Sequence, residues 1–134
     1  MTSKRLIIGA LLRMHLATFK IMAQERKITQ TAGRTALGEF APEFGRLNDD
    51  VLFGEVWNMP GLTPHDRSMV TVATLIGKGI TDSSLRYHLE NAKKAGVSAN
   101  EAAAILTHIA FYVGWPKAWA AFYMAKEVWG SEKE

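Results

Sequence analysis

Signals that start and stop α-helices recur in the second half of this chain, and they constrain its fold more than any other feature. Thr63 followed by Pro64 is a helix start, with threonine as the cap and proline at the first helical position. Ser98 and Glu101 have the spacing of a capping box, and Gly114 is of the type that ends a helix. No strand-like alternation of useful length occurs. The sequence therefore predicts an all-α bundle of about six to seven helices.

We expect one amphipathic helix near the start of the sequence, two short helices after it, and four more beyond residue 60. The first spans about residues 4–27, with one apolar face made of Ile7, Leu11, Met14 and Ile21. The expected bounds of the others are about 34–47, 48–57, Thr63 to Gly77, Thr81 or Asp82 to Gly96, Ser98 to Gly114, and 117–129.

The length and the cysteine count narrow the class of protein. A chain of 134 residues is typical of one domain that buries a core of its own. It contains no cysteine, which excludes disulfides, thiolate metal sites and thiol redox chemistry. Its four histidines form no His-x-His or His-x-x-x-His pair. We therefore expect neither a metal nor another cofactor.

The basic charge of the chain is concentrated in its first third. Residues 1–46 hold eight basic and three acidic side chains, whereas residues 47–134 hold eight and ten. The basic residues are scattered, and no nucleic-acid-binding motif accompanies them. We interpret them as a solvated face and expect no nucleic-acid partner.

An apolar run at residues 6–12 follows Lys4 and Arg5, as in a signal peptide. The run ends at Arg13, no small-x-small cleavage site follows, and it is too short to cross a bilayer. We therefore expect a cytoplasmic protein with no membrane partner.

His88 is the candidate functional residue that stands out. Leu85, His88, Leu89 and Ala92 are spaced i, i+3, i+4 and i+7, so the imidazole lies on the apolar stripe of its predicted helix. A histidine there is either a hydrogen-bonded core residue or part of a site, because its pKa near neutrality lets its surroundings set its charge.

Several unusual elements resemble the carboxymuconolactone decarboxylase family. They are Phe53-Gly54-Glu55-Val56-Trp57, Pro60-Gly61-Leu62-Thr63, Asp66-Arg67-Ser68, Leu85-Arg86-Tyr87-His88, Ala92, Ala95-Gly96-Val97-Ser98, Glu101, and Tyr112-Val113-Gly114-Trp115-Pro116-Lys117-Ala118. Their order and approximate spacing match across residues 30–130, which we interpret as the family core of a single domain, with residues 1–29 as an added helix. The resemblance implies the alkylhydroperoxidase D-like fold and a ring-like homo-oligomer, trimer or hexamer.

The superfamily holds both cofactor-free decarboxylases and peroxide-reducing enzymes. The redox branch needs a Cys-x-x-Cys that ends four residues before the histidine, where this chain has Thr81 and Ser84. A hydroxyl forms neither the thiolate nor the disulfide of that chemistry, so peroxidase activity is disfavoured. The resemblance then implies conversion of 4-carboxymuconolactone to 3-oxoadipate enol-lactone and CO2, a step of aromatic-compound degradation.

Loss of CO2 from a small carboxylated lactone needs a cation to hold the retained anion and an acid to reprotonate the dienolate. Arg67 is the candidate cation, and the alternative is a surface ion pair with Asp66 or a neighbour. His88 is the candidate acid or proton shuttle. Glu55 would orient His88 or share its proton, and the alternative is a solvated carboxylate at a helix end.

A second group of residues is expected to surround the substrate. Trp57, Tyr112 and Trp115 would form walls, although aromatic residues at helical spacing are more often core residues. His108 shares a predicted apolar face with Ile105, Ile109 and Tyr112 and is expected in the site or in a subunit contact. His65 and His15 are expected to be exposed.

One residue leaves an alternative function open. Decarboxylase-like members of the family commonly have arginine where this chain has Met59. If that arginine holds a substrate carboxylate, its loss favours a second hypothesis, a non-catalytic or divergent helical oligomer that binds a small ligand.

Overall fold

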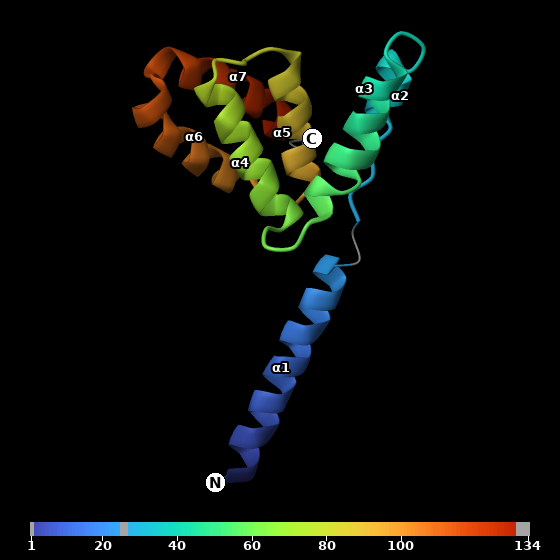
Figure 1. Ribbon diagram of the computed structural model, residues 1–134. Helices are drawn as coiled ribbons and strands as arrows, with labels where there is room; N and C mark the ends of the chain where they lie inside the picture. Colours follow the sequence, from blue (N-terminus) through green and yellow to red (C-terminus); the bar gives the residue numbers. More distant parts are fainter. Residues whose placement is uncertain (1, 25–26, 131–134) are drawn as a thin grey trace. The chain divides into compact units, whose positions relative to one another are not determined.

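The computed structural model describes residues 2–24 and 27–130, and their regular elements are all helical, without a strand (Figure 1). This confirms the predicted all-α class. Residues 1–59 and residues 60–134 form two compact units, which are described separately below.

The first unit begins with a long helix. Helix α1 spans Thr2–Gln24, so it starts slightly before the expected residue 4. Ile7, Leu11 and Met14 of the expected apolar face are exposed, and the side chain of Ile21 lies outside the described residues. The helix was expected to reach residue 27, but Lys27 is not helical, and residues 25 and 26 lie outside the described residues. Among the described residues of the whole chain, no helix is both long and apolar enough to cross a membrane.

The rest of the first unit differs from the two helices expected at 34–47 and 48–57. It contains α2 (Ala32–Leu37), α3 (Pro42–Arg46), the π-helix η1 (Leu47–Phe53) and the 3-10 helix η2 (Val56–Asn58). The predicted break near Asn48-Asp49 is wrong, because the chain there continues helically from α3 into η1.

Asp49 explains this local structure. Its carboxylate is buried and accepts hydrogen bonds from the backbone N–H groups of Gly33 (2.8 Å) and Arg34 (2.9 Å). Burial raises the pKa of Asp49, but hydrogen bonds from Asn48 and from these two N–H groups outweigh it and lower the pKa overall. The carboxylate thus satisfies the first N–H groups of α2 from a helix later in the chain.

The second unit contains four helices whose ends lie close to the expected bounds, although the last begins at Trp115 and not at the expected residue 117. They are α4 (Pro64–Gly77), α5 (Ser83–Lys94), α6 (Ala99–Val113) and α7 (Trp115–Gly130). Thr63 and Ser98 each complete a capping box, and Asp82, one of the two expected caps, caps α5. Gly114 alone separates α6 from α7, with the positive φ of +93° that glycine tolerates.

The core of the second unit is formed by all four helices. Helix α4 packs on α5, α6 and α7, and α7 also packs on α5 and α6. The buried cluster consists of Val72, Ile76, Leu85, Leu89, Ala92, Val97, Ala102, Leu106, Ala121, Ala125 and Val128. Leu85, Leu89 and Ala92 confirm the apolar stripe predicted for the His88 helix.

The buried face of α6 is not the predicted one. On α6 the buried residues are Ala102, Leu106 and Ala110, whereas His108 and Tyr112 are exposed. On α7 alanines and Val128 face the core, and most of the large rings do not. The spacing of the large residues did not predict the buried face, because the small buried residues let α6 and α7 pack closely on their neighbours. The core then has no room for the large rings.

Candidate active site

His88 is half-buried on α5. Its Nδ1 is shielded from solvent and has no hydrogen-bond partner within the described part of the chain. Its ring meets the ring of Tyr87 edge-on, with 5.2 Å between the centroids. Burial lowers the pKa of His88 below its ordinary value of 6.5, so the imidazole is neutral at pH 7. The alternative interpretation, a hydrogen-bonded core histidine, thus finds no partner for Nδ1 among the described residues.

Arg67 lies in the first turns of α4, the helix that packs directly against α5. Its side chain is half-buried and its Nε is shielded from solvent. The neighbouring Asp66 carboxylate accepts hydrogen bonds from the Thr63 backbone N–H and lies 3.4 Å from Nδ1 of His65. Arg67 and His88 thus each have one nitrogen that is shielded from solvent, and they lie on two helices that contact each other.

Glu55 and Trp57 lie in the unit of residues 1–59, whereas Arg67 and His88 lie in residues 60–134. Glu55 is exposed and immediately precedes η2. Trp57 is buried and stacks on Phe53 with the ring centroids 5.5 Å apart. The convergence of Glu55, Arg67 and His88 in one pocket stays a prediction, as does contact of Trp57 with substrate.

The three remaining candidates lie near the junction of α6 and α7. His108 and Tyr112 are exposed on α6, with ring centroids 5.3 Å apart. Trp115 begins α7 and contacts Phe111 with the ring centroids 5.7 Å apart. The expectation that His108 belongs to an apolar stripe is wrong for this chain, and a role in a subunit contact stays a prediction.

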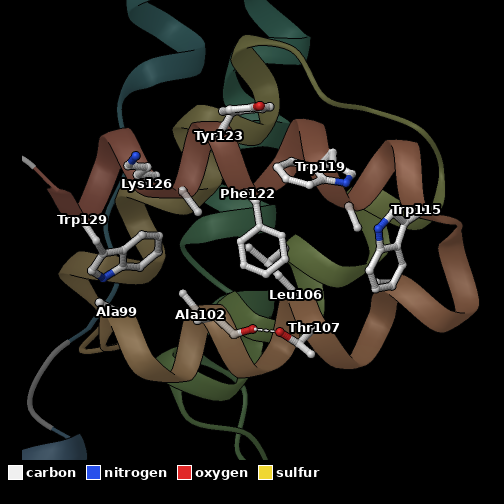
Figure 2. Close-up of a pocket in the computed structure, with 14 residues that line it drawn as sticks. Ala99, Ala102, Leu106, Thr107, Trp115, Trp119, Phe122, Tyr123, Lys126 and Trp129 are labelled. Carbon is white, nitrogen blue, oxygen red and sulfur yellow. Dashed lines mark hydrogen bonds between the residues drawn. The ribbon is translucent and has the colours of Figure 1, made fainter.

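A large apolar groove between α6 and α7 was missed by the sequence interpretation. It has a volume of about 620 Å³, and Trp115 is the one candidate residue that lines it. Figure 2 shows Phe122 at its middle, with Trp129 toward one end and Trp115 toward the other. The signal in the sequence was the alternation of alanine and large rings along residues 115–129.

A polar cluster at the N-terminal ends of α4 and α6 was also missed. His65 was expected to be exposed, but only 28% of its side chain is accessible to solvent. Its Nε2 lies 3.2 Å from Oε1 of Glu101. The hydrogen bond with Glu101, supported by Asp66, raises the pKa of His65. The described side chains contain no group of three His, Asp or Glu residues arranged to hold a metal ion.

Comparison of the sequence with known proteins assigns the chain to a family. The sequence profile of the carboxymuconolactone decarboxylase family matches residues 42–127. A 4-carboxymuconolactone decarboxylase from Acinetobacter baylyi is 39% identical over 92 residues, which cover 69% of this chain and 68% of the relative. The chain therefore belongs to the carboxymuconolactone decarboxylase family.

Proposed function

We propose that this protein is a cofactor-free decarboxylase that acts on a small carboxylated lactone, and that 4-carboxymuconolactone is the first substrate to test. The similarity to the Acinetobacter enzyme supports a decarboxylase-like function. The observation that carries the proposal is the buried, unbonded Nδ1 of His88 beside the helix that carries Arg67. A buried polar atom without a partner costs stability, and a functional site explains why the chain retains it.

In the proposed reaction, the bond between the ring carbon and the carboxylate carbon breaks and CO2 leaves. The electron pair of that bond passes to the ring and forms a dienolate, and a proton is then added to carbon. Arg67 holds the retained anionic group, because its planar guanidinium pairs with a carboxylate or a lactone oxygen. His88 donates the proton, and Glu55 orients His88 or returns its proton.

The lowered pKa of His88 suits this role. In the free protein the imidazole is neutral, since burial disfavours its charged form. A bound dianionic substrate favours the imidazolium, because an opposite charge nearby raises the pKa of histidine. His88 would therefore take up a proton as substrate binds and hold it for the dienolate.

We also propose that the protein assembles into a trimer or a hexamer. The large rings exposed on α6 and α7 support self-association, because exposed apolar surface of this kind is typical of interfaces. In that assembly Trp57, His108, Tyr112 and Trp115 would surround the substrate.

The direct test is to incubate the purified protein with 4-carboxymuconolactone and to follow both its absorbance and the released CO2. We expect turnover by the wild type and by His15→Gln, an exposed histidine on α1, and a loss of at least about a hundredfold in His88→Gln. Absence of turnover by the wild type would contradict the proposal for this substrate.

A second candidate function is the binding of a small carboxylate without chemistry. Met59, in the place of an arginine common in decarboxylase-like members, favours it. Calorimetry decides between the two: saturable binding of 4-carboxymuconolactone without CO2 release supports the binding protein and contradicts the enzyme.

A further inference from the structure

Helix α1 exposes large apolar side chains throughout residues 6–16. Ile7, Leu11 and Met14 share one face, because they are spaced i, i+4 and i+7. These three residues are 56%, 50% and 66% exposed. Other large apolar residues of the helix are exposed beside them: Leu6, Ile8, Leu12 and Leu16. An apolar surface of this extent is typical of a segment that another surface covers.

The same helix carries charge of only one sign. Residues 2–24 contain four basic residues and neither aspartate nor glutamate; the basic residues are Lys4, Arg5, Arg13 and Lys20. The guanidinium of Arg13 lies over Gly9, where a Cβ would be 4.0 Å from its Nη2. Gly9 faces away from Ile7 and Leu11, because two residues along a helix turn the chain by about 200°. The positive charge of Arg13 therefore lies on the side of α1 opposite the apolar face.

The exposed apolar face and the positive charge together select the kind of surface that covers α1. Nucleic acid would pair with the basic residues but would leave the apolar face in water. A membrane with anionic headgroups satisfies both features, because its phosphates attract lysine and arginine and its acyl chains accept leucine and isoleucine. Since residues 2–24 contain no acidic residue, nothing on α1 repels such a surface.

The helix can lie on a membrane although it cannot cross one. Among the described residues, no helix is long and apolar enough to span a bilayer. A helix in the plane of the surface needs no such length, since only its apolar face enters the lipid. The expectation of no membrane partner rested on the shortness of the apolar run at residues 6–12, and it does not apply to a helix that lies flat.

We propose that α1 binds reversibly to membranes that contain anionic lipid, and that it lies in the plane of their surface. Ile7, Leu11 and Met14 enter the acyl chains, while Arg13 lies among the headgroup phosphates. Each basic residue close to such a surface strengthens binding roughly fivefold, so affinity should rise with the fraction of anionic lipid and fall with salt. The proposal is independent of the decarboxylation, because it assigns α1 no part in the reaction.

The test is co-sedimentation of the full chain with vesicles of two compositions. One is phosphatidylcholine alone, and the other is phosphatidylcholine with phosphatidylglycerol in a two-to-one ratio. We expect the wild type to bind the anionic vesicles at low salt and to be released from them by high salt. Failure to bind the anionic vesicles at low salt, or equal binding to both compositions, overturns the proposal.

Substitutions separate the apolar contribution to binding from the electrostatic one. The double variant Ile7→Gln, Leu11→Gln should bind anionic vesicles at least about tenfold more weakly, because two side chains that enter the acyl chains become polar. Arg13→Gln should bind them roughly fivefold more weakly, because one attraction to phosphate is lost. Val70→Gln removes an apolar side chain that is 57% exposed on α4, and this matched control should bind as the wild type does.

The remaining outcomes distinguish other surfaces that could cover α1. If the double variant binds vesicles as tightly as the wild type, another part of the chain contacts the lipid and the proposal is wrong. If the wild type binds no vesicle and the double variant has a lower mass in analytical ultracentrifugation, a second copy covers the apolar face instead. If the double variant loses helix by circular dichroism, Arg13→Gln decides, and unchanged vesicle binding by that variant contradicts the proposal. The CO2 assay judges the reaction separately in every case.

Discussion

His65 and His88, two histidines of the second unit, have pKa shifts in opposite directions. Burial lowers the pKa of His88, whereas the hydrogen bond with Glu101 raises that of His65. His88 is therefore neutral at pH 7 in the free protein, whereas His65 links the capping residues of α4 and α6. The surroundings of each imidazole therefore decide the direction in which its pKa shifts.

The activity of His88 should depend on pH in two distinct ways. The pH profile of kcat/KM reports the free protein, so its falling limb should lie below pH 6.5, where the buried imidazole loses its proton. The profile of kcat reports the complex, in which the bound anion raises the pKa, so its falling limb should lie at higher pH. Steady-state kinetics on wild type and His88→Gln test this, and a falling limb that persists in His88→Gln would assign it to another group.

The stability contributed by His65 should be lost as the pH rises. Its folded pKa lies above 6.5, so the hydrogen-bonded imidazolium stabilises the fold below that pH and ceases to do so as the pH passes the raised pKa. Urea unfolding should show the largest difference between wild type and His65→Gln at about pH 6 and a smaller one in alkaline buffer. His15→Gln is the control, and a difference that is constant with pH would contradict the assignment.

Gly33 is required by the close approach of α2 to the residues that follow it. A Cβ at this position would lie 2.8 Å from Oδ1 of Asp49 and 2.9 Å from the carbonyl oxygen of Gly45. Gly33→Ala should therefore lower the free energy of unfolding by about 1–3 kcal/mol through overpacking. In the control Gly77→Ala, where the nearest atom is 3.8 Å away, urea unfolding should show no loss. An unchanged stability of Gly33→Ala would mean that α2 shifts away freely.

At the scale of elements, the capping boxes determine where α4 and α6 begin. The hydroxyl of Thr63 accepts a hydrogen bond from the backbone N–H of Asp66 at 3.1 Å, and Ser98 does the same for Glu101. Both acidic residues also contact His65, so the two helix starts are fixed together. The caps thus secure the part of α4 that carries Arg67.

Loss of one cap should be measurable on its own. Thr63→Ala removes the side-chain acceptor and should destabilise the protein by about 1 kcal/mol, while Thr63→Ser retains the acceptor and should lose little. Thermal or urea unfolding followed by circular dichroism measures both. Equal effects of the two substitutions would show that packing of the threonine methyl, and not the cap, is responsible.

At the scale of the whole molecule, activity should survive reagents that attack thiols or remove metals. The chain has no cysteine to alkylate, and the proposed reaction assigns each step to side chains. We therefore expect unchanged kcat/KM after iodoacetamide treatment and after dialysis against EDTA. Loss of activity on chelation that one added metal restores would overturn the cofactor-free mechanism.

The sequence by itself determined the helices of the second unit. Thr63, Ser98 and Gly114 act on their immediate neighbours, so their effect is local and readable without tertiary structure. The apolar stripe of α5 was equally predictable, because Leu85 and Leu89 pack in the direction that their spacing implies. The family motifs likewise singled out His88 and Arg67.

The features that depend on contacts between residues far apart in the sequence were decided only by the tertiary structure. The chain does not break near Asp49 as expected, because the carboxylate of Asp49 accepts hydrogen bonds from backbone N–H groups of α2, some 15 residues earlier. The buried face of α6 was predicted wrongly, because its alanines allow a closer approach of the neighbouring helices than rings would, and this depends on those neighbours. The buried Nδ1 of His88, which has no partner among the described residues, and the groove between α6 and α7 are likewise properties of packed helices, which no single segment encodes.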